Sequence, residues 1–415
     1  MSESNVKTIP RHAPMNQFEV VNNCLTIGGQ AITEITSDIG QTPFYAYDRS
    51  VMTEKVESLR RALPQSIHLH YAMKANPMPE VVQHLANETD GLDVASAAEL
   101  KVALATGTDP SDISFAGPGK SDEDLRAAVA SGVIINMESP TEMQRIAALA
   151  QATGRRPTVS IRVNPDFELK TAGMKMGSGP KPFGVDAESV PEMLAELSKL
   201  PLDFMGFHIF SGSQNLREEA IMEAQAKTFE LAYRLAEHAP APLRWLNIGG
   251  GLGIPYFPGE QRLDLAPIAA NLTPLLETAS KKLPGAEIVM ELGRYLTAEA
   301  GVYVCEIVDR KVSRGEIFLV TNGGLHHHLA ASGNFGQVIR KNYPLCLGNR
   351  VNAPELETVQ VVGPLCTPLD LLGNRVELPP ARPGDLIVVF QSGAYGFSAS
   401  PRDFLSHPQP AQILL

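Results

Sequence analysis

A single lysine follows the first strand that the sequence predicts in its amino-terminal third. The apolar run His68–Ala72 before Lys74 is typical of a buried strand, and the following Asn76-Pro77 is typical of a turn. Lysine is seldom buried without a partner, so Lys74 is either a solvated loop charge or an amine whose pKa is lowered for Schiff-base chemistry. Taken alone, the solvated charge is the simpler interpretation.

Chemically capable residues also stand in or just after further expected strands. In chain order these are Leu92–Val94 with Asp93, Thr158–Val163 with Arg162, Phe204–Ile209 with His208, Arg244–Ile248 followed by Gly249-Gly250-Gly251, and Glu287–Glu291 with Glu291 itself. Each has a structural interpretation, such as a capping carboxylate, a rim ion pair, a core histidine or a tight turn. Their joint position at one end of the strands favours function.

The elements that would position these residues alternate regularly between residues 46 and 300. The two other expected strands are Ile113–Ala116 and Val133–Asn136, and the helical stretches include Ala97–Thr106, Asp122–Ala130, Thr141–Thr153 and Arg217–His238. About eight such units predict an α/β fold with a parallel sheet, closed as a TIM (β/α)8 barrel. A doubly wound open sheet is the rival, but it usually has fewer units and a helix-opening GxGxxG motif.

The pattern changes after Gly301. Val302–Val312, Glu316–Val320, Thr358–Val362 and Leu386–Phe390 are β-like and separated by Gly/Pro turns, which predicts a mostly antiparallel β domain over residues 301–415. Residues 1–15 are expected to be a disordered tail. Residues 16–45 are expected to contribute β-strands to the C-terminal domain.

The composition limits the function and the location. The 415 residues carry 35 basic and 46 acidic side chains, a net charge of −11, which argues against nucleic acid as the main ligand. Four scattered cysteines without a CxxC pair argue against zinc and redox motifs, and Met1–Pro14 lacks the apolar segment of a signal peptide. The sequence therefore predicts a cytoplasmic protein with no membrane span. The run His326-His327-His328 is not expected to bind metal, because adjacent strand residues point alternately.

The triple glycine Gly249-Gly250-Gly251 is the best anion site in the sequence. Successive backbone N–H groups can converge there without obstruction by Cβ atoms, and TIM barrels typically hold phosphate after strands seven and eight. A strand-end lysine, a phosphate loop, a histidine able to stack on a ring and the strand-end Glu291 together match pyridoxal 5'-phosphate. Glu291 would keep the pyridine nitrogen protonated. Nicotinamide binding is not favoured, because the glycine spacing is wrong.

With these residues in order, the chain resembles the fold-type III pyridoxal-phosphate decarboxylases, the diaminopimelate/ornithine/arginine decarboxylase family. The resemblance runs from about Thr42 to Tyr395. Besides the lysine, histidine, glycine and glutamate segments above, its motifs are Gly91–Leu100, Phe183-Gly184-Val185, Gly363–Asp370 and Gly393-Ala394-Tyr395. The stretch Leu325–Gly336 is similar to the subgroup associated with exosortase A systems.

The resemblance implies a barrel plus a β domain of the alanine racemase/decarboxylase-like type, and a role for each matched residue. Lys74 forms the Schiff base, His208 stacks on the cofactor ring, and Glu291 pairs with the ring nitrogen. Cys366 reaches in from the partner subunit of a homodimer and delivers a proton to Cα. The further cofactor residues implied are Asp93, Arg162, Ser213, Gly249, Gly250, Gly251, Gly293, Arg294 and Tyr395. The implied substrate contacts are Arg294, Arg340, Tyr343, Thr367 and Tyr395.

Two departures from the family pattern bear on ligands. The usual His-x-Gly-Ser-Gln is here longer by two residues, from His208 to Gln214, which leaves open whether Ser211 or Ser213 meets the phosphate. The acidic residue that usually follows the cysteine and binds a distal ammonium is Thr367 in this chain. A lost charge-assisted hydrogen bond is worth roughly 1.5–3 kcal/mol, so the substrate is expected to lack a free distal ammonium.

The resulting prediction is α-decarboxylation of an L-amino acid or a derivative. One alternative is a racemase on the same cofactor, which would need a second base on the opposite ring face. Another is decarboxylation of a carrier-linked aminoacyl group, for which the acidic chain offers no obvious basic docking surface. A third is a non-enzymatic regulator, against which the retention of Lys74, Glu291 and Cys366 argues.

Overall fold

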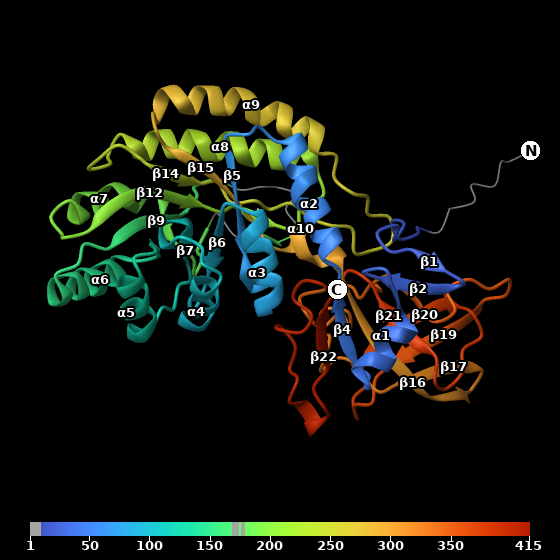
Figure 1. Cartoon of the computed structure of the whole chain (residues 1–415). Helices are drawn as coiled ribbons and strands as arrows, with labels where there is room; N and C mark the ends of the chain where they lie inside the picture. Colours follow the sequence, from blue (N-terminus) through green and yellow to red (C-terminus); the bar gives the residue numbers. More distant parts are fainter. Residues whose placement is uncertain (1–9, 168–173, 176–178) are drawn as a thin grey trace, which may run out of the picture. The chain divides into compact units, whose positions relative to one another are not determined.

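The computed structural model describes residues 10–167, 174–175 and 179–415 (Figure 1). The chain divides into two compact units. The barrel unit comprises Met52–Gly253 and Leu263–Leu296, and the β unit comprises Met1–Val51, Ile254–Arg262 and Thr297–Leu415. The segment Ile254–Arg262, which the sequence analysis assigned to the barrel, thus groups with the β unit. Of the expected disordered tail, residues 1–9 lie outside the described residues.

Eight parallel strands close into a barrel, which confirms the expected fold. They are β5 (Ile67–Ala72), β6 (Gly91–Val94), β7 (Ile113–Phe115), β8 (Ile134–Met137), β9 (Thr158–Asn164), β12 (Asp203–Ile209), β14 (Trp245–Asn247) and β15 (Glu287–Leu292). Each strand pairs in parallel with the next, and β15 pairs with β5 to close the ring. All eight carboxyl ends therefore meet at one rim.

Helices cover the outside of these strands (Figure 1). They are α3 (Pro79–Glu88), α4 (Ala97–Ala105), α5 (Asp122–Ser131), α6 (Pro140–Thr153), α7 (Val190–Leu197), α8 (Glu218–Ala236) and α9 (Leu265–Lys282). Serine caps start three of them soon after a barrel strand: Ser96, Ser121 and Ser139 each accept a hydrogen bond from a backbone N–H of the first helical turn. In the part of the chain that the structure describes, no helix is long and apolar enough to cross a bilayer.

The barrel interior changes from apolar to polar toward the rim. Trp245, Ile134 and Val289 form a buried apolar cluster. Asn136 and Asn247, two residues beyond Ile134 and Trp245 on the same strand faces, are fully buried polar side chains. The first polar layer of the barrel interior therefore lies directly above the apolar cluster, on the side of the rim.

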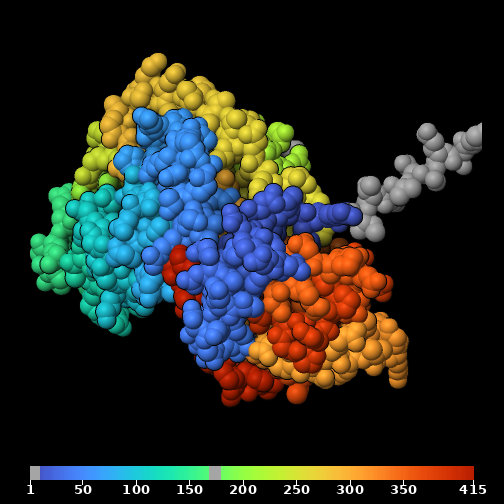
Figure 2. Space-filling view, turned by 45° about the vertical axis from the view of Figure 1, so that its right-hand side comes forward, coloured from blue at the N-terminus to red at the C-terminus, as the bar shows by residue number. Residues whose placement is uncertain are grey.

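The β unit is built around a mostly antiparallel sheet. Its strands are β16 (Gly301–Ser313), β17 (Glu316–Thr321), β18 (Leu345–Leu347), β19 (Glu357–Val362), β20 (Leu371–Leu378) and β21 (Leu386–Val389), with β4 (Phe44–Tyr47) and β22 (Ala411–Leu414) at one side. Among the described strands of this sheet, only the β17–β19 and β4–β22 pairs are parallel. Figure 2 shows blue amino-terminal residues of this unit beside its red carboxyl-terminal residues. Three short strands, β1 (Val20–Val21), β2 (Cys24–Ile27) and β3 (Gln30–Ala31), form a separate small sheet.

The three consecutive histidines of the β unit are fully buried in the turn after β17. His328 Nδ1 accepts a hydrogen bond from the Ala331 N–H, so its Nε2 carries the proton and donates to Ser392 Oγ at 2.9 Å. Ser392 in turn donates to the Val389 carbonyl. This network needs the neutral imidazole, and burial lowers the pKa of His328 to about 3 from 6.5. No cluster of His, Cys, Asp and Glu among the described residues could hold a metal ion.

We expect the protein to lose stability in mild acid through His328. The unfolded chain binds a proton at this residue below about pH 6.5 and the folded chain does not, so stability falls as the pH falls from about 6.5 toward 3. The loss at pH 5 is about 2 kcal/mol. The free energy of unfolding is measured with denaturant at pH 7.5 and at pH 5. Its decrease between these two pH values should be smaller in His328→Gln than in the natural protein, by about 2 kcal/mol. Equal falls in both proteins would contradict the assignment, and His238→Gln, at an exposed histidine, is the control.

Candidate active site

Lys74 stands on the barrel rim. β5 ends at Ala72, and Met73–Ala75 form one 3-10 turn directly after it. The Lys74 Nζ lies 3.4 Å from Glu291 Oε1, and the lysine side chain is 48% exposed. Because β15 pairs in register with β5, closure of the barrel brings these two residues together from opposite ends of its sequence.

Glu291 is the buried carboxylate of this site. Its side chain is 9% exposed, and its Oε2 lies 3.1 Å from His208 Nε2 of β12, although the two atoms are not aligned as a hydrogen bond. Burial opposes ionisation of Glu291, but Lys74, His208 and Arg162 outweigh it and lower the pKa of this carboxyl below its usual range. The barrel mouth therefore holds a negative charge beside a half-exposed amine.

Arg162 is held by a carboxylate that the sequence analysis missed. Arg162 Nη1 donates to Glu138 Oε1 at 2.8 Å, and both side chains are buried. Glu138 also accepts backbone N–H groups from Gly117 and Gly184. Its position one residue after β8 is the same strand-end signal that identified the other residues. Burial opposes ionisation of Glu138, but Arg162 and Lys120 lower its pKa.

Asp93 lies inside the barrel in a ladder of polar side chains. Its Oδ1 accepts from Ser114 Oγ at 2.5 Å and lies 3.4 Å from His70 Nδ1. The ladder continues from Ser114 to Asn136 and Ser160 on the next two strands. In the described part of the chain, Asp93 Oδ2 has no hydrogen-bond partner. The ladder fixes Asp93 with one acceptor oxygen still available.

The triple glycine lies against the Glu291 segment. Gly249 and Gly251 have φ of 66° and 73°, in the left-handed region that favours glycine. A Cβ on Gly250 would lie 2.1 Å from the Glu291 carbonyl oxygen, and one on Gly251 would lie 2.8 Å from that of Gly212. A Cβ on Gly293, after β15, would meet the Ala72 carbonyl oxygen at 2.9 Å. A side chain at any of these three glycines would overlap a neighbouring carbonyl oxygen. The backbone segments of the rim can therefore pack this closely only because these residues are glycine. Arg294 follows Gly293 and begins the short helix α10 (Arg294–Thr297).

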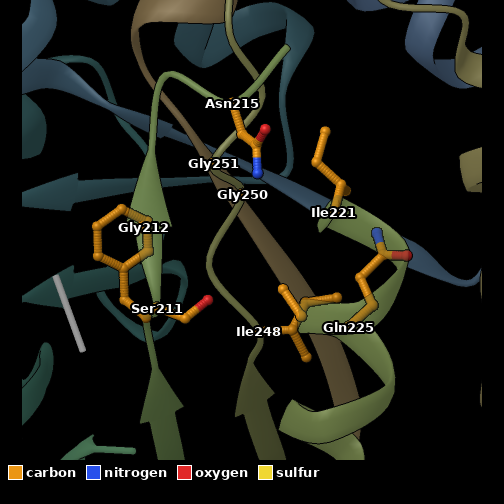
Figure 3. Close-up of a pocket in the computed structure, with 10 residues that line it drawn as sticks. Ser211, Gly212, Asn215, Ile221, Gln225, Ile248, Gly250 and Gly251 are labelled. Atoms are coloured by element: carbon orange, nitrogen blue, oxygen red, sulfur yellow. The ribbon is translucent and has the colours of Figure 1, made fainter. Parts of the chain in front are cut away.

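A pocket opens beside this loop (Figure 3). Its wall combines the loops after β12 and β14 with one side of α8, and the residues are Phe210, Ser211, Gly212, Asn215, Ile221, Ala224, Gln225, Ile248, Gly250 and Gly251. Ser211 points into this space, toward Ile248 (Figure 3). Ser213, the serine expected at the phosphate, lies in β13 (Gly212–Ser213) and is not part of the wall.

A second lysine of the barrel unit has a structural role. The Lys120 side chain is 1% exposed and donates to Glu142 Oε1 at 2.6 Å and to the carbonyls of Gly117 and Asn136. All three of its protons are therefore used. Lys74, in contrast, is half exposed at the rim, so it is the lysine that a ligand can reach.

The β unit carries the other expected site residues. Cys366 is exposed, and Thr367 next to it accepts the Leu369 N–H in a tight turn. Asp370, the carboxylate of this turn, is buried and accepts the N–H groups of Leu325 and Leu365. Tyr395 is half buried, with φ of 54°. The turn thus carries the thiol of Cys366 and the hydroxyl of Thr367. Its carboxylate, Asp370, is occupied by hydrogen bonds from the backbone.

Arg340 and Tyr343 are more enclosed than expected for substrate contacts. Arg340 donates to the carbonyls of Ser332 and Leu371 and to Asn342 Oδ1, which uses three of its five N–H groups. Tyr343 is buried, with its ring 4.7 Å from that of Tyr256. Both residues tie loops of the β unit together, and their contact with substrate stays a prediction.

Comparison with known proteins identifies clear relatives. Residues 49–298 match the family model described as "Pyridoxal-dependent decarboxylase, pyridoxal binding domain". The L-glutamyl-[BtrI acyl-carrier protein] decarboxylase of Niallia circulans is 38% identical over 92% of this chain and 90% of its own. The 2-[(L-alanin-3-ylcarbamoyl)methyl]-2-hydroxybutanedioate decarboxylase of Staphylococcus aureus is 30% identical over 89% and 93%. The crystal structure of diaminopimelate decarboxylase from Helicobacter pylori with L-lysine superposes with a TM-score of 0.82 at 28% identity, over 92% and 94%.

Proposed function

Because the chain belongs to the pyridoxal-dependent decarboxylase family, we propose that it releases the α-carboxyl group of an L-amino acid or an amino-acid derivative as carbon dioxide. The observation that carries this proposal is the half-exposed Lys74 amine 3.4 Å from the buried, ionised Glu291 at the mouth of the barrel. A racemase is disfavoured by the family membership, since the relatives named above are decarboxylases.

The residues of the rim fit pyridoxal 5'-phosphate, the cofactor of this family. The triple glycine carries no Cβ atoms over its backbone, and Gly249 and Gly251 have the left-handed φ of loops whose N–H groups can meet a phosphate. His208 is a buried side chain whose ring nitrogens have no hydrogen-bond partner in the described part of the chain. When bound, the cofactor supplies an electron-poor ring that accepts the electrons left as the carboxyl group departs.

The residues of this chain then have distinct tasks. Lys74 would hold the cofactor through its amine, which is exposed to an arriving substrate. Glu291 would keep a proton on the ring nitrogen of the cofactor, because its own carboxyl is kept ionised. Arg162, fixed by Glu138, adds a positive charge to the same mouth. Asp93, Gly249–Gly251, Gly293 and Arg294 complete the cofactor site, with Ser213 or Ser211 at the phosphate.

The substrate lacks a free distal ammonium. The turn after Cys366 has Thr367 where the family has an acid, and the remaining carboxylate, Asp370, is consumed by backbone N–H groups. Within this turn, whose residues the structure describes, no other carboxylate could pair with an ammonium. The Niallia and Staphylococcus relatives carry acyl-carrier-linked and carbamoyl groups in their substrate names. A carrier-linked aminoacyl group is therefore the second candidate, favoured by the 38% identity to the Niallia enzyme.

The active form is a homodimer in which Cys366 of each subunit protonates Cα in the other. An exposed apolar group supports this contact: Phe335, Val338, Ile339 and Leu369 are exposed, with Val338 fully so. Asn334 ties its loop to the turn of Cys366 through the Leu369 carbonyl. A monomeric mass by light scattering at assay concentration would contradict this arrangement. Membership of the exosortase A-associated subgroup and a cytoplasmic location complete the proposal, on the strength of the sequence alone.

Carbon dioxide release from a panel of substrates tests the proposal. We expect L-glutamyl thioesters or amide derivatives to react at least about tenfold faster than lysine or ornithine, the factor that one charge-assisted hydrogen bond represents. Product chirality and amine formation are measured in parallel. Equal rates with lysine or ornithine would contradict the substrate class. Inversion of an amino acid without carbon dioxide would contradict decarboxylation itself.

A further inference from the structure

The polar ladder inside the barrel has a direction. Ser160 Oγ donates a hydrogen bond to Asn136 Oδ1, and the Asn136 amide donates in turn to Ser114 Oγ. The Ser114 hydroxyl then donates to Asp93 Oδ1 at 2.5 Å, so every donor of the ladder points toward this one carboxyl group. This direction favours an ionised Asp93, because a carboxylate only accepts hydrogen bonds.

His70 approaches Asp93 from the side opposite the ladder. It lies on β5, which pairs with β6 on the edge away from β7. The His70 side chain is buried, with its Nδ1 3.4 Å from Asp93 Oδ1 and its Nε2 2.5 Å from where a Cβ on Gly91 would lie. Since the carboxylate oxygen is an acceptor, Nδ1 carries a hydrogen. Asp93 is therefore held from both neighbouring strands, and its Oδ2 has no hydrogen-bond partner among the described residues.

Acidic side chains face His70 from both neighbouring strands and from the turn before β7. They are Asp93 of β6, Glu287 and Glu291 of β15, and Asp112 of the 3-10 turn η2 (Pro110–Asp112). The other histidine of β5, His68, lies 3.0 Å from Glu287 at the far end of the strand. Burial opposes protonation of His70, but the acidic neighbours, Asp93 first among them, outweigh it and raise the pKa of His70 above 6.5.

We propose that His70 is a positioning residue of the cofactor site: as an imidazolium it holds the Asp93 carboxylate in place and leaves Oδ2 available to the cofactor. The inference rests on the proposed function, in which Asp93 belongs to that site. The chain thus supplies one cation for each of two carboxylates inside the barrel, Lys74 beside Glu291 and His70 beside Asp93. A neutral His70 would leave the buried Asp93 without this counter-charge, and an unpaired buried charge is costly.

Nitrogen NMR of the histidine rings tests the charge of His70 in the full-length apoprotein. The protein is labelled with ¹⁵N-histidine, and the ring signals that disappear in His70→Gln are assigned to His70. We expect these signals to titrate above the ordinary value of 6.5, and Asp93→Asn to lower the pH at which they titrate. If His70→Gln does not fold, the ring whose titration moves in Asp93→Asn identifies the pair. Titration of His70 at or below pH 6.5 would overturn the inference.

Binding of pyridoxal 5'-phosphate to the same apoprotein tests the link to the cofactor site. We expect His70→Gln, which keeps a hydrogen-bond donor but has no charge, to bind about three- to tenfold more weakly than the natural protein at pH 6.5. This deficit should shrink to within about twofold at pH 9, because the natural protein loses the same charge as the pH rises through the pKa of His70. Combined with Asp93→Asn, the substitution should add no more than about a twofold loss, because His70 acts through Asp93.

His68→Gln, on the same strand, is the matched control and should bind like the natural protein at both pH values. Thermal unfolding checks that each variant folds. Binding by His70→Gln within about twofold of the natural protein at pH 6.5 would defeat the inference alone, and so would a deficit that is the same at both pH values, which indicates lost packing. If the natural protein itself binds no pyridoxal 5'-phosphate, the proposed function fails and the inference with it.

Discussion

Lys74→Ala is expected to lower the decarboxylation rate by about a thousandfold or more, which corresponds to about 4 kcal/mol of transition-state stabilisation. The reason is that Lys74 is the amine at the rim that a cofactor can reach, 3.4 Å from Glu291. The variant should also lose the visible absorption of the bound cofactor on dialysis. An added small amine should restore part of the activity, because it replaces the missing nitrogen.

Two other lysines of the barrel unit control this prediction. Lys101→Ala, at an exposed position of α4, should leave the rate and the absorption band unchanged. Lys120→Met should lower stability rather than chemistry, because Lys120 is buried in a pair with Glu142. A Lys74→Ala protein with near-normal rate and retained cofactor would contradict the assignment.

Glu291→Gln is expected to lower kcat by about a hundredfold or more, with a smaller change in cofactor affinity. The amide cannot carry the negative charge that Lys74, His208 and Arg162 maintain on Glu291, so it cannot keep a proton on the ring nitrogen. Single-turnover rates and the position of the cofactor absorption band are the measurements.

Glu287→Gln provides a control on the same strand. Glu287 begins β15 and pairs with His68, at the end of the barrel opposite the rim. We expect this variant to keep a rate close to that of the natural protein. A rate in Glu291→Gln equal to that of Glu287→Gln would show that the charge at the mouth has no part in the chemistry.

The eight barrel strands could be predicted from the sequence because they are short apolar runs that alternate with helical stretches. Lys74, Arg162 and Glu291 could be found with them, because all parallel strands end at one rim and a strand end is visible in the sequence. The β4–β16 pairing was also within reach, since an apolar segment before the barrel needs a sheet to join.

Other features depend on contacts that the sequence does not carry. Glu138 was missed because its importance comes from Arg162 in the neighbouring strand, although it follows β8 as directly as Lys74 follows β5. Arg340 stays a predicted substrate contact, and the sequence did not show that three of its donors hold protein oxygens. The alignment of His208 with Arg162 and Asn247 depends on the register between neighbouring strands, which the sequence alone does not determine.

Covalent trapping of the cofactor tests the central claim most directly. The protein is incubated with pyridoxal 5'-phosphate, reduced with borohydride so that a lysine-bound pyridoxal group becomes permanent, and digested for peptide mass mapping. The account predicts one modified peptide, containing Lys74, and no modification in Lys74→Ala. Modification at Lys120 or another lysine in place of Lys74, or no modified peptide at all, would contradict it.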